Sequence, residues 1–123
     1  MRRPSIRDLY PRTFELIERT TEEAYELVLY YLNRGDEERT FPEEDKRRIG
    51  DKISDLTELW SSFDTDFPKE NLNSVQVIED YIWMEHIVME LEEATELFQV
   101  NGQKPILFSI GNWIKEIIAI LDE

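Results

Sequence analysis

Residues 74–100 read SVQVIEDYIWMEHIVMELEEATELFQV, and this stretch contains no Gly or Pro that would interrupt a helix. At about 100° per residue, its apolar side chains fall on two faces of one long helix. The first face holds Val77, Tyr81, Met84, Val88, Leu91 and Phe98, and the second holds Val75, Ile78, Ile82 and Met89. Two apolar faces predict packing on two sides, so we expect this helix to lie at the centre of a bundle.

Three more amphipathic segments are available to pack against it. The first begins near Asp8 or Pro11 and ends at Asn33, before Gly35. The second starts at Thr40, where Thr-Phe-Pro-Glu is typical of a capping box, and runs to about Phe63. The last begins at Pro105 and continues to the C-terminus. Their predicted core stripes are Tyr10, Phe14, Ile17, Thr21, Ala24, Val28 and Tyr31; Ile49, Ile53, Leu56, Leu59 or Trp60, and Phe63; and Ile106, Ile110, Trp113, Ile117 and Ile120, widened by Leu107, Ile114, Ile118 and Leu121.

These four segments with short links predict an all-α, antiparallel four-helix bundle. The chain of 123 residues is 41% apolar, which suits one helical domain over residues 1–123, with residues 1–7 as a flexible basic arm. It contains no cysteine, so disulfides, thiolate metal sites and cysteine nucleophiles are excluded. No stretch is apolar for the roughly 18 residues of a membrane span, so we expect a soluble, cytoplasmic protein without membrane contact.

The charge of the chain is strongly acidic and unevenly distributed. Residues 1–12 carry net +3, whereas the whole chain carries −14, which leaves −17 for the remainder. A surface of this sign repels phosphate, so direct nucleic-acid binding by the acidic body is disfavoured and a basic protein partner is favoured. The alternative interpretation is that the acidity only keeps a small domain in solution.

Apolar area at two places also indicates self-association. The second helix is apolar on one side only, and residues 27–32 (LVLYYL) are apolar nearly all round their helix. Because 123 residues leave part of this area uncovered, the sequence predicts a homodimer.

Two parts of the chain share a similar two-helix sequence pattern. The run EEAYEL at residues 22–27 recurs as EEATEL at 92–97, and the second-helix run IGDKISDL at 49–56 recurs as IGNWIKEI at 110–117. The repeat predicts a duplicated αα-hairpin with a pseudo-twofold axis; the alternative is chance recurrence between amphipathic helices of similar composition.

The repeated unit resembles the all-α nucleoside triphosphate pyrophosphohydrolases of the MazG type and the related phosphoribosyl-ATP pyrophosphatases. Their pattern is E-E-x-x-E, followed on the next helix by E-x-x-D, and Glu22, Glu23, Glu26 and Asp51 match it. The resemblance implies a nucleotide pyrophosphohydrolase in which these four carboxylates hold Mg²⁺ against a pyrophosphate.

Both copies depart from that pattern. Arg48 stands where the first copy needs a glutamate, and Ser109 and Asn112 replace the acidic pair of the second copy. An arginine at a ligand position repels the hard cation that oxygen ligands bind. The helical register also places Glu22 and Glu26 opposite the apolar stripe of their helix, as in a solvated acidic face.

No complete catalytic constellation remains. His86 is the only histidine, and Glu90 one turn away favours a surface ion pair. We therefore predict a non-catalytic acidic helical module that needs no cofactor and masks a basic partner surface, as an inhibitor or immunity-type protein does. The alternative is an Mg²⁺-dependent nucleotide pyrophosphohydrolase, or a degenerate descendant, with Glu22, Glu23, Glu26 and Asp51 as ligands.

Overall fold

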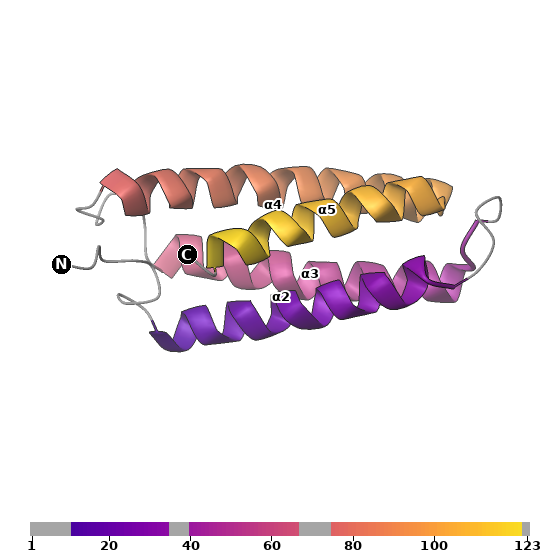
Figure 1. The fold of residues 1–123 in the computed structure, drawn as a ribbon, viewed down its shortest axis with the longest axis horizontal. Helices are drawn as coiled ribbons and strands as arrows, with labels where there is room; N and C mark the ends of the chain where they lie inside the picture. The colour runs from indigo at the N-terminus through magenta and orange to yellow at the C-terminus, as the bar shows by residue number, and fades with distance from the viewer. Residues whose placement is uncertain (1–10, 35–39, 67–74, 122–123) are drawn as a thin grey trace.

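The computed structural model describes residues 11–34, 40–66 and 75–121 and contains four α-helices (Figure 1). They are α2 (Pro11–Leu32), α3 (Glu43–Asp66), α4 (Val75–Asn101) and α5 (Lys104–Leu121). Successive helices run in opposite directions and pack lengthwise, so the predicted all-α antiparallel four-helix bundle is confirmed. The predicted flexible arm, residues 1–7, lies outside the described residues.

The helices pack in chain order around one core. Contacts join α2 to α3, α3 to α4, α4 to α5, and α5 back to α2, so each helix occupies a corner of the bundle. The expectation that the third helix lies at the centre is therefore wrong. Of its second apolar face, Ile82 and Met89 are 51% and 53% exposed, and the side chains of Val75 and Ile78 lie outside the described residues. One face of α4 suffices because the other three helices each contribute an apolar stripe of their own.

The core is formed largely by the predicted stripes. Its buried apolar side chains are Phe14, Ile17, Ala24, Val28, Tyr31, Ile49, Ile53, Leu56, Trp60, Met84, Ile87, Val88, Leu91, Phe98, Leu107, Ile110, Ile114, Ile117 and Leu121. In α5, Leu107, Ile114 and Leu121 lie deeper than predicted, whereas Ile106 and Trp113 are only partly buried. The buried side of α5 is therefore centred closer to Leu107, Ile114 and Leu121 than expected.

Two buried threonines do not leave unsatisfied hydroxyl groups in this core. The Thr21 hydroxyl donates to the Ile17 carbonyl at 2.6 Å, and the Thr95 hydroxyl donates to the Leu91 carbonyl at 2.7 Å. Each bond stays within one helix and reaches back four residues, a geometry open to threonine in helices. The two polar groups therefore cost the core little.

At one end of the bundle, a backbone hydrogen bond joins the α2–α3 connection to the α4–α5 connection. The Gly102 carbonyl, at the turn from α4 to α5, accepts a hydrogen bond from the Phe41 amide at 2.8 Å. Gly102 has φ +59°, the left-handed conformation that glycine adopts at helix C-termini. The Pro42 carbonyl accepts the first bond of α3, from the Lys46 amide at 3.0 Å, so Pro42 is the N-cap. The predicted capping box with Thr40 as cap is therefore wrong by two residues.

Lys46 and Gln99 connect the start of α3 to the end of α4 through two reciprocal bonds. The Lys46 ammonium donates to the Gln99 carbonyl at 2.9 Å, and the Gln99 amide nitrogen donates to the Lys46 carbonyl at 2.7 Å. The same ammonium lies 2.6 Å from a Glu43 carboxylate oxygen. The Gln99 carbonyl is one of the last four of α4, which receive no hydrogen bond from an amide of their own helix. The Lys46 ammonium of α3 donates to it instead and places a positive charge at the negative end of the helix dipole.

The two glycines of the repeat each face the corresponding helix of the other hairpin. Gly50 in α3 and Gly111 in α5 occupy the same place in the repeat, and each faces the first helix of the other hairpin. A Cβ on Gly50 would lie 2.7 Å from the Gln99 side chain, and one on Gly111 would lie 3.3 Å from Val28. The arrangement agrees with the pseudo-twofold relation that the repeat predicts, while common ancestry stays a prediction.

The apolar segment at residues 27–32 is divided between core and surface. Val28 and Tyr31 are buried, whereas Leu29 and Tyr30 are exposed. Tyr30 carries the guanidinium of Arg34 over its ring, at 4.9 Å from the centroid. Apolar area therefore remains on α2, as the homodimer prediction assumed.

The homodimer itself stays a prediction for sedimentation equilibrium. We expect the native chain to associate with rising concentration and Leu29→Glu to shift it toward monomer, because a charge would be buried in the contact. A monomer at all concentrations would contradict the prediction.

Candidate functional site

The carboxylates implied by the family resemblance lie on the surface of α2 and α3. Glu22, Glu23, Glu26 and Asp51 are all exposed. Glu23 reaches across the helix pair, and its carboxylate accepts a hydrogen bond from the Lys52 ammonium at 2.7 Å. That hydrogen bond, with the positive charge of Lys52, lowers the pKa of Glu23 below its ordinary value. Glu23 is thus already paired with a cation.

The structure does not bring these four side chains together as metal ligands. Within residues 11–34, 40–66 and 75–121, no three His, Cys, Asp or Glu side chains converge closely enough to hold a metal ion. Arg48, at the position where the family pattern needs a glutamate, lies near Glu44 and donates to the Tyr31 hydroxyl at 3.0 Å. In this arrangement Arg48 connects α3 to α2.

A magnesium titration separates the two interpretations of these glutamates. We expect millimolar Mg²⁺ to change the melting temperature of the native chain no more than it changes that of Glu23→Gln or Asp51→Asn, because Mg²⁺ only screens exposed carboxylates that do not converge on one site. The measurement is thermal unfolding at matched ionic strength. Saturable stabilisation by Mg²⁺ that both substitutions abolish would instead support the pyrophosphohydrolase alternative.

By net charge, α4 is the most acidic helix of the bundle. It carries seven Asp and Glu residues and no Lys or Arg, whereas α2, α3 and α5 each contain both signs of charge. The cation at its C-terminal end is supplied by Lys46 of α3. In the described parts of the chain, every helix is too short or too polar to cross a lipid bilayer.

The outward side of α4 is apolar as well as acidic. Its exposed large apolar side chains are Ile82, Trp83, Met89, Leu97 and Val100. Between them lie exposed carboxylates at Glu92, Glu93 and Glu96. We call this outward face, from residue 82 to residue 100, the α4 strip. The strip combines an apolar contact area with charge of a single sign. This combination distinguishes it from the scattered apolar residues that are normal on a protein surface.

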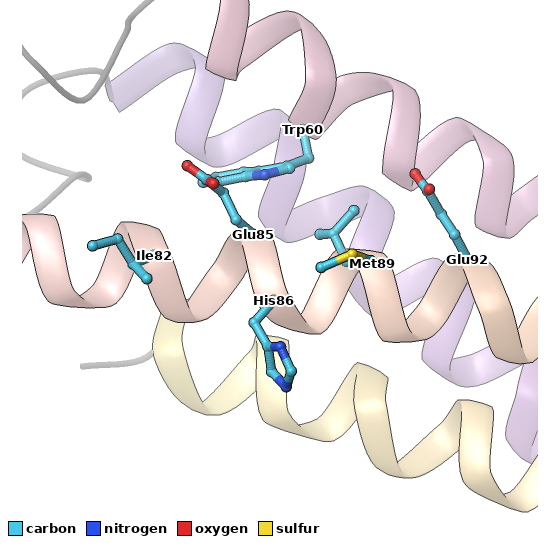
Figure 2. A pocket seen from close by; sticks show the side chains of 7 residues that line it. Trp60, Ile82, Glu85, His86, Met89 and Glu92 are labelled. Carbon is cyan, nitrogen blue, oxygen red and sulfur yellow. The ribbon is translucent and has the colours of Figure 1, made fainter.

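A hollow of about 510 Å³ adjoins the strip where α4 meets α3 (Figure 2). Its lining comprises Trp60 from α3, and Ile82, Glu85, His86, Val88, Met89 and Glu92 from α4. Trp60 and Val88 are buried, so the floor is apolar, whereas Glu85 and Glu92 bring carboxylates to it. The hollow is open to solvent and therefore suits a protruding side chain of a partner better than an enclosed small molecule.

His86 belongs to an aromatic cluster between α4 and α5. Its ring stacks on Trp83 with centroids 5.3 Å apart, and it meets Trp113 of α5 edge to face at 6.2 Å. In Figure 2 the ring points toward α5, away from the carboxylate of Glu85. The interaction seen for His86 is thus aromatic, in place of the expected ion pair with Glu90. The cluster fixes one edge of the α4 strip.

The sequence carries a signal for the α4 strip that helical periodicity alone does not reveal. Periodicity predicts the second apolar face as a packing face, whereas Ile82 and Met89 on it are exposed. The signal is the absence of Lys and Arg between residues 75 and 101, which distinguishes the second apolar face of α4 from an ordinary solvated face. Charged residues of both signs are usual on a solvated helix face.

Comparison with known proteins gave no match among family models, curated proteins or solved structures.

Proposed function

We propose that this protein is a non-catalytic, acidic helical module that binds and masks a basic surface of a partner protein, as an inhibitor or immunity-type protein does. The observation that carries the proposal is the α4 strip, where exposed apolar side chains lie among carboxylates on a helix without Lys or Arg. Apolar contact supplies affinity, and the uniform charge selects basic partners and speeds their approach. The net charge of −14 acts in the same direction over the whole molecule.

The test compares two variants that lose the same charge from different helices. Glu92→Gln, Glu93→Gln and Glu96→Gln together neutralise part of the α4 strip, whereas a control neutralises three exposed glutamates of α2. The control set is Glu15, Glu22 and Glu26, chosen so that the Glu23–Lys52 pair stays intact. Proteins captured from a lysate at low salt are purified, and their affinities for the native chain and both variants are measured.

We expect the captured partner to be basic. The α4 variant should bind it about tenfold more weakly, because each of three exposed charge pairs contributes about 0.5 kcal/mol of binding free energy. The α2 variant should bind nearly as well as the native chain. Affinity should also fall as salt rises, because surface charges are screened beyond about 10 Å at 0.1 M salt. Capture of no basic protein, or equal losses in the two variants, would contradict the proposal.

A further inference from the structure

On the α4 strip and beside it, apolar and acidic side chains each recur once at a spacing of seven residues. Ile82 and Met89 are seven residues apart, and so are Glu85 and Glu92. A seven-residue spacing is the repeat of helices that pack lengthwise at about 20° to one another, with apolar residues in the seam and charges beside it. The segment from Ile82 to Glu92 therefore has the spacing of a lengthwise helix contact, and Glu96 stands at the next position of the apolar series. In the described parts of the chain, no helix covers the exposed side chains of Ile82 and Met89.

We propose that the partner element that binds the α4 strip is a cationic amphipathic α-helix packed lengthwise along it. This inference rests on the proposed function and specifies the shape of the basic partner. Between residues 82 and 100 the strip is about 27 Å long at 1.5 Å per residue, which an ~18-residue helix matches end to end. An apolar stripe on that helix would face Ile82, Met89 and Val100, which are all exposed.

Charge complementarity fixes the chemistry of the occupant. Carboxylates of Glu92, Glu93 and Glu96 flank the apolar side chains, and α4 offers no positive group to an acidic partner. Lys or Arg beside the apolar stripe of the partner would lie opposite these carboxylates, as e and g residues do in coiled coils. A second copy of α4 is a poor occupant, because the exposed carboxylates of Glu92, Glu93 and Glu96 would face carboxylates of the same strip.

The hollow beside Met89 gives the contact a centre. A Leu, Phe or Met side chain of the partner helix can enter it and cover the apolar floor formed by Trp60 and Val88. Glu85 and Glu92, one heptad apart on α4, lie within the lining of this hollow. The structure thus favours a partner helix with a large apolar residue about midway between two basic ones.

The probe is a synthetic peptide of ~18 residues with Leu at the a and d heptad positions and Lys elsewhere. A second peptide has the same composition in an order that breaks the apolar stripe. Calorimetry with the native chain should give at least about tenfold tighter binding for the amphipathic peptide, since both carry the same charge. Equal binding of the two peptides would overturn the helix proposal but leave the proposed function in place.

Two protein variants locate the contact. Met89→Glu places a charge at the centre of the strip, and because Met89 is exposed the fold should persist. It should weaken binding of the amphipathic peptide at least about tenfold, whereas Leu16→Glu, at an exposed position on α2, should leave it unchanged. Equal effects of both variants would overturn the inference. Self-association of the native chain that Met89→Glu abolishes would assign the strip to a second copy, and failure of every basic probe to bind would count against the proposed function as well.

Discussion

Phe98→Ala should destabilise the bundle by about 3–5 kcal/mol. Phe98 is 0% exposed and is one of the largest fully buried side chains of the core. Its ring also packs against Phe41 of the α2–α3 connection, with centroids 5.8 Å apart. Truncation removes the apolar contacts of the ring and leaves a cavity that the surrounding helices fill only in part. The loss is a large part of the 5–15 kcal/mol that stabilises a typical domain.

The measurement is urea unfolding of the native chain and the variant, read as a shift of the midpoint. Val100→Ala is the matched control, because Val100 lies on the same helix but is 78% exposed. That control should stay within about 0.5 kcal/mol of the native chain. A loss below about 1 kcal/mol for Phe98→Ala would contradict the core described above.

Lys46→Met should cost about 1.5–3 kcal/mol, the usual contribution of a hydrogen bond to a charged group. Methionine keeps the length of the apolar stem but removes the ammonium that donates to the Gln99 carbonyl and lies beside Glu43. That carbonyl is then left without its partner at the C-terminus of α4, and the helix dipole there loses its compensating charge. Lys46 is only 6% exposed, so water reaches the vacated position poorly.

Arg47→Met is the control for this second prediction. Arg47 is the next residue of α3 and is exposed, so its replacement removes the same charge without opening a buried contact. Thermal unfolding of both variants should show a clear loss for Lys46→Met and almost none for Arg47→Met. Similar losses would mean that the Lys46 contact with α4 does not stabilise the bundle.

The fold could be predicted because amphipathic spacing is a local property. The stripe from Phe14 to Tyr31 and the stripe from Ile49 to Trp60 are buried as their period requires. The turn at Gly102 can also be predicted locally, because an Asn-Gly pair such as Asn101-Gly102 commonly ends a helix. The Lys46–Gln99 contact cannot be predicted in this way, because the two residues are far apart in sequence and no local pattern brings a lysine to the end of another helix.

The position of α4 shows where sequence periodicity stops being informative. An apolar side chain on a helix can face either the core or a partner outside the chain, and the spacing is the same in both cases. Ile82 and Met89 have the spacing of core residues, yet they are exposed because the apolar stripes of α2, α3 and α5 complete the core without them. Among the candidate metal ligands, the contact between Glu23 and Lys52 likewise depends on how α2 and α3 pack.

The α4 strip is the surface that we propose binds a basic partner. The most direct test is amide NMR of the labelled chain during titration with the amphipathic Leu and Lys peptide at low salt. We predict that the largest shift changes occur in α4 between Ile82 and Val100, together with the indole N–H of Trp60 beside the hollow. Largest changes on the outward face of α2, around Glu15, Glu22 and Glu26, would contradict the claim.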